Sequence, residues 1–177
     1  YTGGPAPYGY RGLGDLFVFV YFGLVAVTGT YYVQAAAVAV AGVPTFTAPA
    51  DLVPLAAVVA ALPAAGLSTC ILVVNNIRDR ETDAEAGKRT LAVTLGYTGS
   101  RIEFLLMLGM AYVVPVVFAA TGYGLATLAP LVTLPLAARL ARTVLTETGG
   151  EALNPALETT GKLLFAHSLL FAAGLAV

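Results

Sequence analysis

The sequence predicts an all-α, polytopic membrane protein, a transmembrane helical bundle of about five spans. Three observations lead to this prediction. Apolar residues make up 58% of the 177 residues, and the mean hydropathy is +0.84. Charged residues make up only 11%, less than half of the roughly 25% found in soluble domains. The apolar residues also gather into runs close to the roughly 20 residues that a membrane-spanning helix needs.

Five apolar runs define the expected spans, and we take them in chain order. The last two are the shortest, and prolines within the runs are expected to kink the helices without ending them, because neighbouring helices can satisfy the freed carbonyls. The expected spans are Leu16 to Val40, Leu52 to Ile77, Phe104 to Thr121, Leu125 to Leu140, and Leu163 to Val177.

The basic residues support this division of the chain. Under an alternating topology all nine fall on one side of the membrane, which by the positive-inside rule is the cytoplasm. The connections AGVPTFTAPAD and TGYG, on the other side, contain none. We therefore expect a multi-pass protein of the cell membrane with cytoplasmic charged loops. The nine residues are Arg11, Arg78, Arg80, Lys88, Arg89, Arg101, Arg139, Arg142 and Lys162.

Other features exclude or limit several classes. The net charge of −1 and the absence of a basic block give no sign of a nucleic-acid partner. A single cysteine, Cys70, cannot form an internal disulfide. The chain begins with the loop-like YTGGPAPYGYRG instead of a signal peptide and stops within an apolar run. We therefore expect residues 1–177 to be one partial domain that lacks N-terminal spans.

The most informative segment is NNIRDRETDAEAGKRT, residues 75–90, in which eight of sixteen residues are charged. Asn75, Asp79 and Asp83 are spaced four apart, so they would share one stripe if the second span continued as a helix. Two neighbouring carboxylates repel each other, and a divalent cation would remove that conflict. Carboxylate and amide oxygens suit Mg²⁺, which commonly shares its coordination with substrate phosphates.

Basic residues follow this stripe within two turns. Lys88 and Arg89 are placed to bind phosphate oxygens, so the segment is typical of a Mg²⁺ site with a diphosphate clamp. From spacing alone, a solvated loop whose charges pair locally explains the same residues equally well. The two amides Asn75 and Asn76 at the end of an apolar run favour a functional site, because such groups need a partner within a membrane.

The segment NNIRDRETDAEAGKRTLAVTLG resembles the second aspartate-rich motif of the UbiA superfamily of intramembrane prenyltransferases. Its NN-hydrophobic-RD, TD and GK-x-TLAV-x-x-G elements are similar to the 1,4-dihydroxy-2-naphthoate polyprenyltransferase branch. YTGGPAPYGYRGLGDLFVFVYFGLVAVTGTYYVQ and LNPAL are similar to further parts of that branch. The resemblance implies a nine-span fold of which this chain holds the last five spans and only the second motif.

The resemblance also implies an activity and roles for individual residues. Asp79 and Asp83 would be catalytic Mg²⁺ ligands supported by Asn75, and Lys88 would contact the diphosphate, with Arg78 and Arg89 as weaker candidates. The reaction would transfer a polyprenyl group from its diphosphate to 1,4-dihydroxy-2-naphthoate with loss of CO₂, giving demethylmenaquinone. Tyr8 and Arg11 could bind the aromatic acid, although a belt of interfacial tyrosines explains the N-terminal segment more simply.

Three alternatives stand beside this interpretation. One is a prenyltransferase of the same superfamily that acts on another aromatic acceptor. A phospholipid head-group transferase of the CDP-alcohol type would need a D-x-x-D-G-x-x-A-R motif, which the chain lacks. A transporter subunit would need ionisable residues at mid-depth, where we expect only His167.

Asn154 and Pro155 are interpreted as the start and N-cap of the last span.

Overall fold

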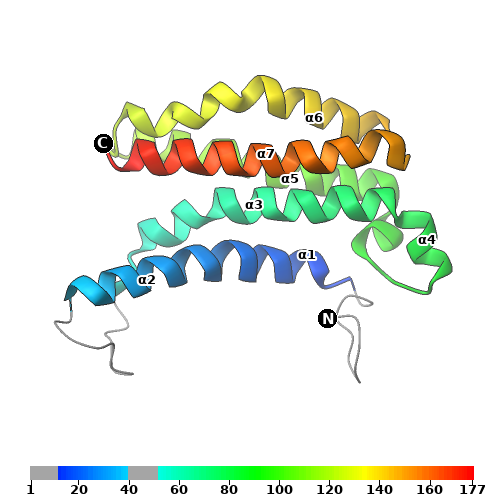
Figure 1. Cartoon of the computed structure of the whole chain (residues 1–177), viewed down its shortest axis with the longest axis horizontal. Coiled ribbons are helices and arrows are strands. Elements are labelled where there is room, and N and C mark those ends of the chain that lie inside the picture. Colours follow the sequence, from blue (N-terminus) through cyan, green and yellow to red (C-terminus); the bar gives the residue numbers. More distant parts are fainter. Residues whose placement is uncertain (1–11, 40–51) are drawn as a thin grey trace.

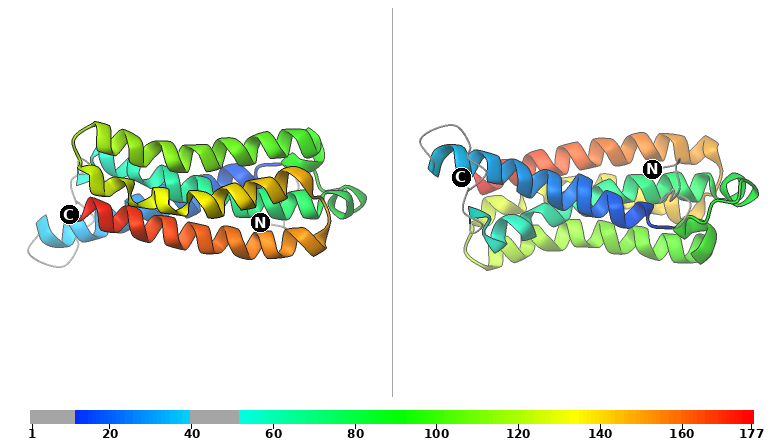
Figure 2. Two further views of the ribbon diagram at one scale, coloured as in Figure 1. Left: turned by 90° about the horizontal axis from the view of Figure 1, so that it is seen from above. Right: turned by 90° about the horizontal axis from the view of Figure 1, so that it is seen from below.

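The computed structural model describes residues 12–39 and 52–177, and these form long helices that run alongside one another (Figures 1 and 2). The first helix is continuous and comprises α1 (Gly14–Phe17), the π-helical η2 (Val18–Val25) and α2 (Ala26–Ala39). α3 (Leu55–Arg78) and the short α4 (Arg80–Glu85) follow. The remainder consists of α5 (Leu91–Ala120), the 3₁₀-helical η4 (Leu125–Thr133), α6 (Leu134–Thr146) and α7 (Gly150–Leu175).

The predicted helical membrane bundle is confirmed. Within the described residues, four helices are long and apolar enough to cross a membrane, namely Gly14–Val38, Leu55–Arg78, Leu91–Ala120 and Leu125–Thr146. α7 has 26 residues, about 39 Å at 1.5 Å per residue, and lies alongside them (Figure 1). Its first half is more polar, with Glu151, Glu158 and Lys162.

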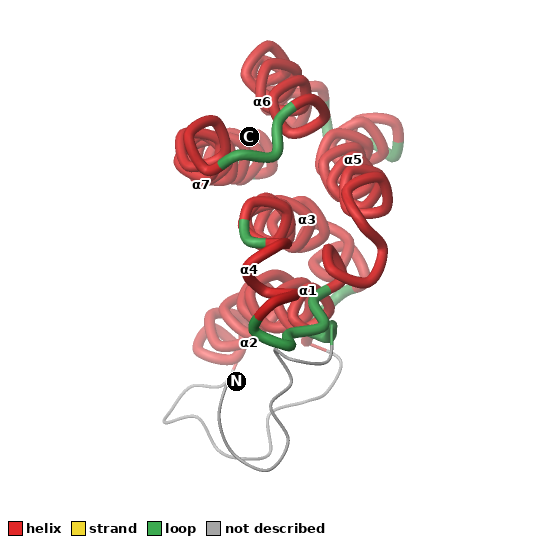
Figure 3. The backbone as a smooth tube through the Cα atoms, turned by 90° about the vertical axis from the view of Figure 1, so that its right-hand side faces the viewer, coloured by secondary structure: helices red, strands yellow, loops and turns green. Residues whose placement is uncertain are grey.

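α3 is the central helix and packs against η2, α5 and α7 (Figure 3). This position explains why α3 contributes five residues to the main buried cluster, among them Leu67, Val73 and Ile77, each at most 1% exposed. Phe104 of α5 and Leu163 of α7 complete the same cluster. α3 therefore holds its C-terminal end, and the charged segment that follows, fixed relative to three other helices.

Two helices start earlier in the chain than the predicted spans did. The third was expected at Phe104, but α5 starts at Leu91, where the Thr90 hydroxyl caps the helix by accepting the Val93 N–H at 3.3 Å. A backbone kink at Gly96, with φ of 69°, lies inside it. The fifth was expected at Leu163, but α7 starts at Gly150 and its N-cap is Gly149, so the assignment of Asn154 as an N-cap is wrong.

A close helix contact supports a stability prediction. A Cβ added at Gly23 would lie 2.1 Å from the Cβ of Ala65, so η2 and α3 approach each other through small residues. We expect Gly23→Val to lower the free energy of unfolding by about 1–3 kcal/mol through overpacking. Gly29→Val is the matched control on the same helix, because no described atom beyond its chain neighbours and its own helix backbone lies within 4 Å of its added Cβ. Thermal unfolding in detergent compares the two, and equal melting temperatures would contradict the contact.

The topology prediction fits the arrangement of the loops. α4 and the α6–α7 connection lie at one end of the bundle, and the α5–η4 connection lies at the other (Figure 1). We expect reporter fusions at Glu85 and Gly149 to report the cytoplasm and a fusion at Gly122 to report the opposite side. A fusion at Gly122 that reported the same side as Glu85 would contradict the span assignment.

Candidate metal and diphosphate site

The charged segment begins where α3 ends. Asp79 has a non-helical backbone (φ −95°, ψ 7°) and separates α3 from α4. The Asp79 N–H nevertheless donates to the Asn75 carbonyl at 3.0 Å, and the Asp83 N–H donates to the Asp79 carbonyl at 2.8 Å. The backbone therefore keeps a helix-like register through the three residues, although α3 itself does not continue as one helix.

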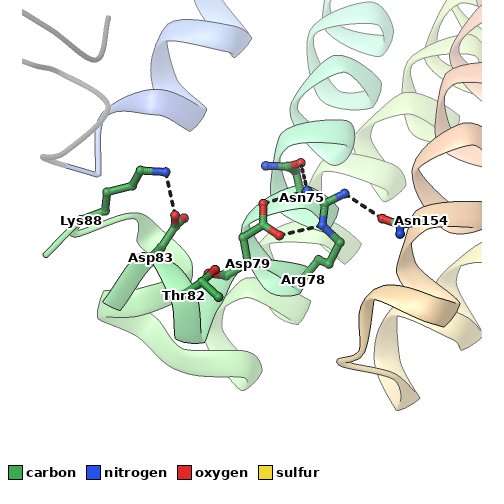
Figure 4. Close-up of polar contacts among 7 residues, drawn as sticks. All are labelled: Asn75, Arg78, Asp79, Thr82, Asp83, Lys88 and Asn154. Carbon is green, nitrogen blue, oxygen red and sulfur yellow. Dashed lines mark hydrogen bonds and ion pairs between the residues drawn. The ribbon is translucent and has the colours of Figure 1, made fainter. Parts of the chain in front are cut away.

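Arg78 connects three residues, Asn75, Asp79 and Asn154, and we call these four residues together the Arg78 network (Figure 4). Its Nε and Nη2 donate to the two carboxylate oxygens of Asp79, each at 2.7 Å. Nη2 also donates to the Asn75 side-chain oxygen at 2.7 Å, and Nη1 to that of Asn154 at 2.8 Å. The hydrogen bonds from Arg78 lower the pKa of the Asp79 carboxyl, with a smaller contribution from the charge of Lys88.

Asp83 belongs to a separate ion pair beside this network. The Lys88 ammonium lies 2.7 Å from Asp83 Oδ1, and the Lys88 backbone N–H donates to the Asp83 carbonyl at 2.9 Å. Gly87, with φ of 72°, makes the tight turn that brings Lys88 back to Asp83. Asp83 is only 6% exposed, so it is not part of a freely solvated loop.

The remaining predicted site residues are less closely involved. Arg89 has an exposed side chain, while its backbone carbonyl lies against Gly12, where an added Cβ would be 3.0 Å away. Tyr8 and Arg11 lie outside the described residues. The structure thus brings together Asn75, Arg78 and Asp79, places the Asp83–Lys88 pair beside them, and directs Arg89 outward.

The side-chain oxygens of Asp79, Asp83 and Asn75 are chemically suited to Mg²⁺. Among residues 12–39 and 52–177, however, no group of three or more His, Cys, Asp or Glu side chains is placed to hold a metal ion. Both aspartates are instead neutralised by a neighbouring cation. The donors fit a metal, but they form an incomplete set that needs further oxygens from water or a diphosphate.

An apolar cavity of about 380 Å³ leads to this network. It lies between η2, α3 and α7, and among the described residues that line it, only Ser68 and Asn75 have polar side chains. Because Asn75 also accepts from Arg78, one amide connects the apolar cavity with the charged network. The lining residues are Val18, Phe22, Ser68, Ile71, Leu72, Asn75 and Leu164.

The structure adds polar residues that we did not expect from the sequence. Asn154 joins the Arg78 network from α7, 76 residues away along the chain. Asp15 is 4% exposed and accepts from the Asn76 amide at 3.4 Å. Together with Glu103 it lines a second cavity of about 330 Å³. Asp15 and Glu103 both lie within helices that are long and apolar enough to cross a membrane, so these helices carry two carboxyl groups that the sequence analysis did not single out.

Comparison with known proteins decides the family. The sequence profile of the UbiA prenyltransferase family matches residues 1–173. The chain belongs to the UbiA prenyltransferase family. The family match covers nearly the whole chain and argues against both the CDP-alcohol transferase and the transporter alternatives. It also agrees with the membrane-embedded helical bundle.

Individual relatives narrow the comparison within the UbiA family. The 1,4-dihydroxy-2-naphthoate octaprenyltransferase of Mycobacterium tuberculosis is 43% identical, covering 99% of this chain and 54% of the relative. The Escherichia coli protein of that name is 35% identical over 99% of this chain and 52% of its own length. Human UbiA prenyltransferase domain-containing protein 1 is 34% identical over 99% of this chain and 46% of its own length. The chain spans about half the length of the curated relatives it matches.

Proposed function

We propose that the full-length protein transfers a polyprenyl group from prenyl diphosphate to 1,4-dihydroxy-2-naphthoate, with loss of CO₂ and diphosphate, to give demethylmenaquinol, the reduced form of demethylmenaquinone, for menaquinone synthesis. The observation that carries this proposal is the sequence identity of 35–43% to several proteins named 1,4-dihydroxy-2-naphthoate octaprenyltransferase, across nearly the whole chain. The geometry of the charged segment and of the cavity beside it is consistent with that chemistry.

Each substrate has a region suited to it. A polyprenyl chain is apolar and needs a dry, apolar lining, which the cavity beside Asn75 offers. The diphosphate is polyanionic and would lie at the charged end, near Arg78 and Lys88. Placing the chain in the cavity brings the allylic carbon, which joins the two parts of the substrate, close to the Arg78 network.

UbiA prenyltransferases generally use a divalent metal ion. In our proposal the ion is Mg²⁺, held by Asp79 and Asp83 with support from Asn75. When bound, it would neutralise charge on the leaving diphosphate as the allylic C–O bond breaks. Arg78 and Lys88, with Arg89 as a weaker contributor, would bind the diphosphate oxygens and stabilise the same charge.

This arrangement requires the two ion pairs to exchange partners. Arg78 lies 2.7 Å from Asp79, and Lys88 lies 2.7 Å from Asp83. With a metal ion bound, Asp79 and Asp83 would hold it, and Arg78 and Lys88 would bind the diphosphate in place of these carboxylates. The apolar lining of the cavity would then keep water away from the allylic cation until the electron-rich naphthoate ring attacks it.

The acceptor side and the surroundings of the site complete the proposal. Tyr8 and Arg11 would bind the aromatic ring and the carboxylate of the acceptor, and further N-terminal spans would close the cavity. We place the protein in the cell membrane with the α4 end in the cytoplasm, because the basic residues fall on that side.

A carboxyl-labelled acceptor tests the reaction directly. The full-length protein in membranes should release labelled CO₂ from 1,4-dihydroxy-2-naphthoate only when a polyprenyl diphosphate and Mg²⁺ are both present. Chelation of the metal is the matched control and should stop the release. Prenylation of a single-ring phenolic acid, without CO₂ release from the naphthoate, would instead favour the alternative of another aromatic acceptor.

A further inference from the structure

The Arg78 guanidinium uses two separate edges. The Nε and Nη2 edge holds both carboxylate oxygens of Asp79, each at 2.7 Å. The Nη1 group donates to Asn154 on α7 at 2.8 Å (Figure 4). The contact with Asn154 therefore does not depend on the contact with Asp79.

α7 also supports the stem of the arginine. A Cβ added at Gly150 would lie 3.8 Å from both Cγ and Cδ of Arg78, so the first turn of α7 runs along the aliphatic part of the side chain. Asn154 is one turn further along the same helix and accepts the hydrogen bond from the guanidinium end of the side chain. Together they fix the direction of an arginine that begins on α3.

The edge that holds Asp79 is also the edge that a phosphate would bind. A guanidinium fork matches a carboxylate and a phosphate in the same bidentate geometry. If Asp79 turned to a metal ion, this edge would lose its carboxylate and keep only the contact of Nη2 with Asn75, while Nη1 would still donate to Asn154. A neutral amide at position 154 orients the arginine without neutralising its charge, so the full positive charge stays available.

We propose that Asn154 is a positioning residue for the diphosphate. It holds Arg78 from α7 while the Nε and Nη2 edge changes partner from the Asp79 carboxylate to a diphosphate. This inference rests on the proposed function and adds to it a residue of the last helix that acts only through Arg78.

The test uses inorganic diphosphate with Mg²⁺ as the probe, and measures its dissociation constant for the purified full-length protein alongside the melting temperature. Asn154→Leu, which is similar in size but lacks an acceptor, should weaken binding about fivefold, since a hydrogen bond to a charged group is lost at an exposed position. In an Arg78→Gln background the same substitution should have no further effect. Glu158→Gln, on an exposed part of α7, is the control and should bind as the wild type does.

Asn154→Asp separates positioning from simple helix anchoring and decides the question if the leucine variant fails to fold. An aspartate keeps the acceptor and should leave the melting temperature unchanged or higher, but its charge should weaken diphosphate binding. Wild-type binding by Asn154→Asp, or an additional loss on adding Asn154→Leu to Arg78→Gln, would overturn the role of Asn154. Failure of the wild-type protein to bind the probe would instead count against the proposed function itself.

Discussion

Replacing Asp79 or Asp83 by alanine in the full-length protein is expected to reduce prenyl transfer at least about a hundredfold, since a bound metal supplies several kcal/mol of charge stabilisation. Each substitution removes a proposed oxygen ligand and leaves a cation, Arg78 or Lys88, without its carboxylate. Asp→Asn keeps the shape but removes the charge, and should cost nearly as much. Turnover of labelled prenyl diphosphate in membranes measures the effect.

A control shows whether the effect is specific to the two aspartates. Glu81 lies in α4, as Asp83 does. Its side chain is exposed and accepts a hydrogen bond from the Tyr97 hydroxyl at 3.3 Å. Glu81→Gln should therefore retain activity within about threefold. The side chain is on the surface, where a substitution changes the free energy of unfolding by no more than about 0.5 kcal/mol, so the site should stay folded. Melting temperatures should confirm that the aspartate variants are folded. Full activity in Asp83→Asn would remove that residue from the metal site.

The 177 residues alone are expected to show no prenyl transfer. The described part of the chain offers two carboxylates at the site, and both are already paired with cations. Mg²⁺ gives up its water reluctantly and requires near-octahedral geometry, so we expect it to bind weakly there. The apolar cavity also needs walls on every side to exclude water from an allylic cation.

Complementation tests this expectation. Co-expression of the proposed N-terminal spans as a separate chain should restore part of the activity, because independently inserted helices can associate within a membrane. The assay compares the 177-residue chain alone, the pair, and the intact protein with the same two substrates. Turnover by the 177 residues alone would show that the second aspartate-rich motif is sufficient and would contradict the expectation that these residues need further spans for activity.

The sequence predicted the features of the bundle that depend on local composition. Long apolar runs identified the helices, and the dense charged block was expected at one end of the bundle, where the structure places it (Figure 1). The local spacing of Asn75, Asp79 and Asp83 also persisted in the backbone hydrogen bonds. These features depend on residues within a few positions of one another, so a single sequence is enough to predict them.

The features that the sequence missed depend on contacts between distant segments. The start of α5 was missed because the expected span was begun at the uncharged run after Arg101 and Glu103. In the structure Arg101 is satisfied by the carbonyls of Val144 and Glu147, at 3.1 and 3.2 Å. The role of Asn154 was missed for the same reason, since its partner Arg78 lies on another helix. No spacing rule within one helix predicts either contact.

The side chains of residues 75–90 also show why the sequence supported two interpretations, a solvated loop with local charge pairs and a metal and diphosphate site. Arg78 with Asp79 and Lys88 with Asp83 are the local pairs that a solvated loop would form. The burial of Asp83 and the link from Arg78 to α7 are not expected of such a loop. The same residues can serve as charge pairs without substrate and as ligands when substrate binds, which is the exchange that we propose.

Binding of Mn²⁺, a paramagnetic substitute for Mg²⁺, tests the central claim most directly. Electron paramagnetic resonance of the purified full-length protein would measure bound Mn²⁺ with and without inorganic diphosphate. We predict that diphosphate promotes Mn²⁺ binding in the wild-type protein and that the double variant Asp79→Asn, Asp83→Asn loses this binding while keeping its melting temperature. Diphosphate-dependent Mn²⁺ binding of unchanged affinity in the double variant would contradict the assignment of the metal to these two aspartates.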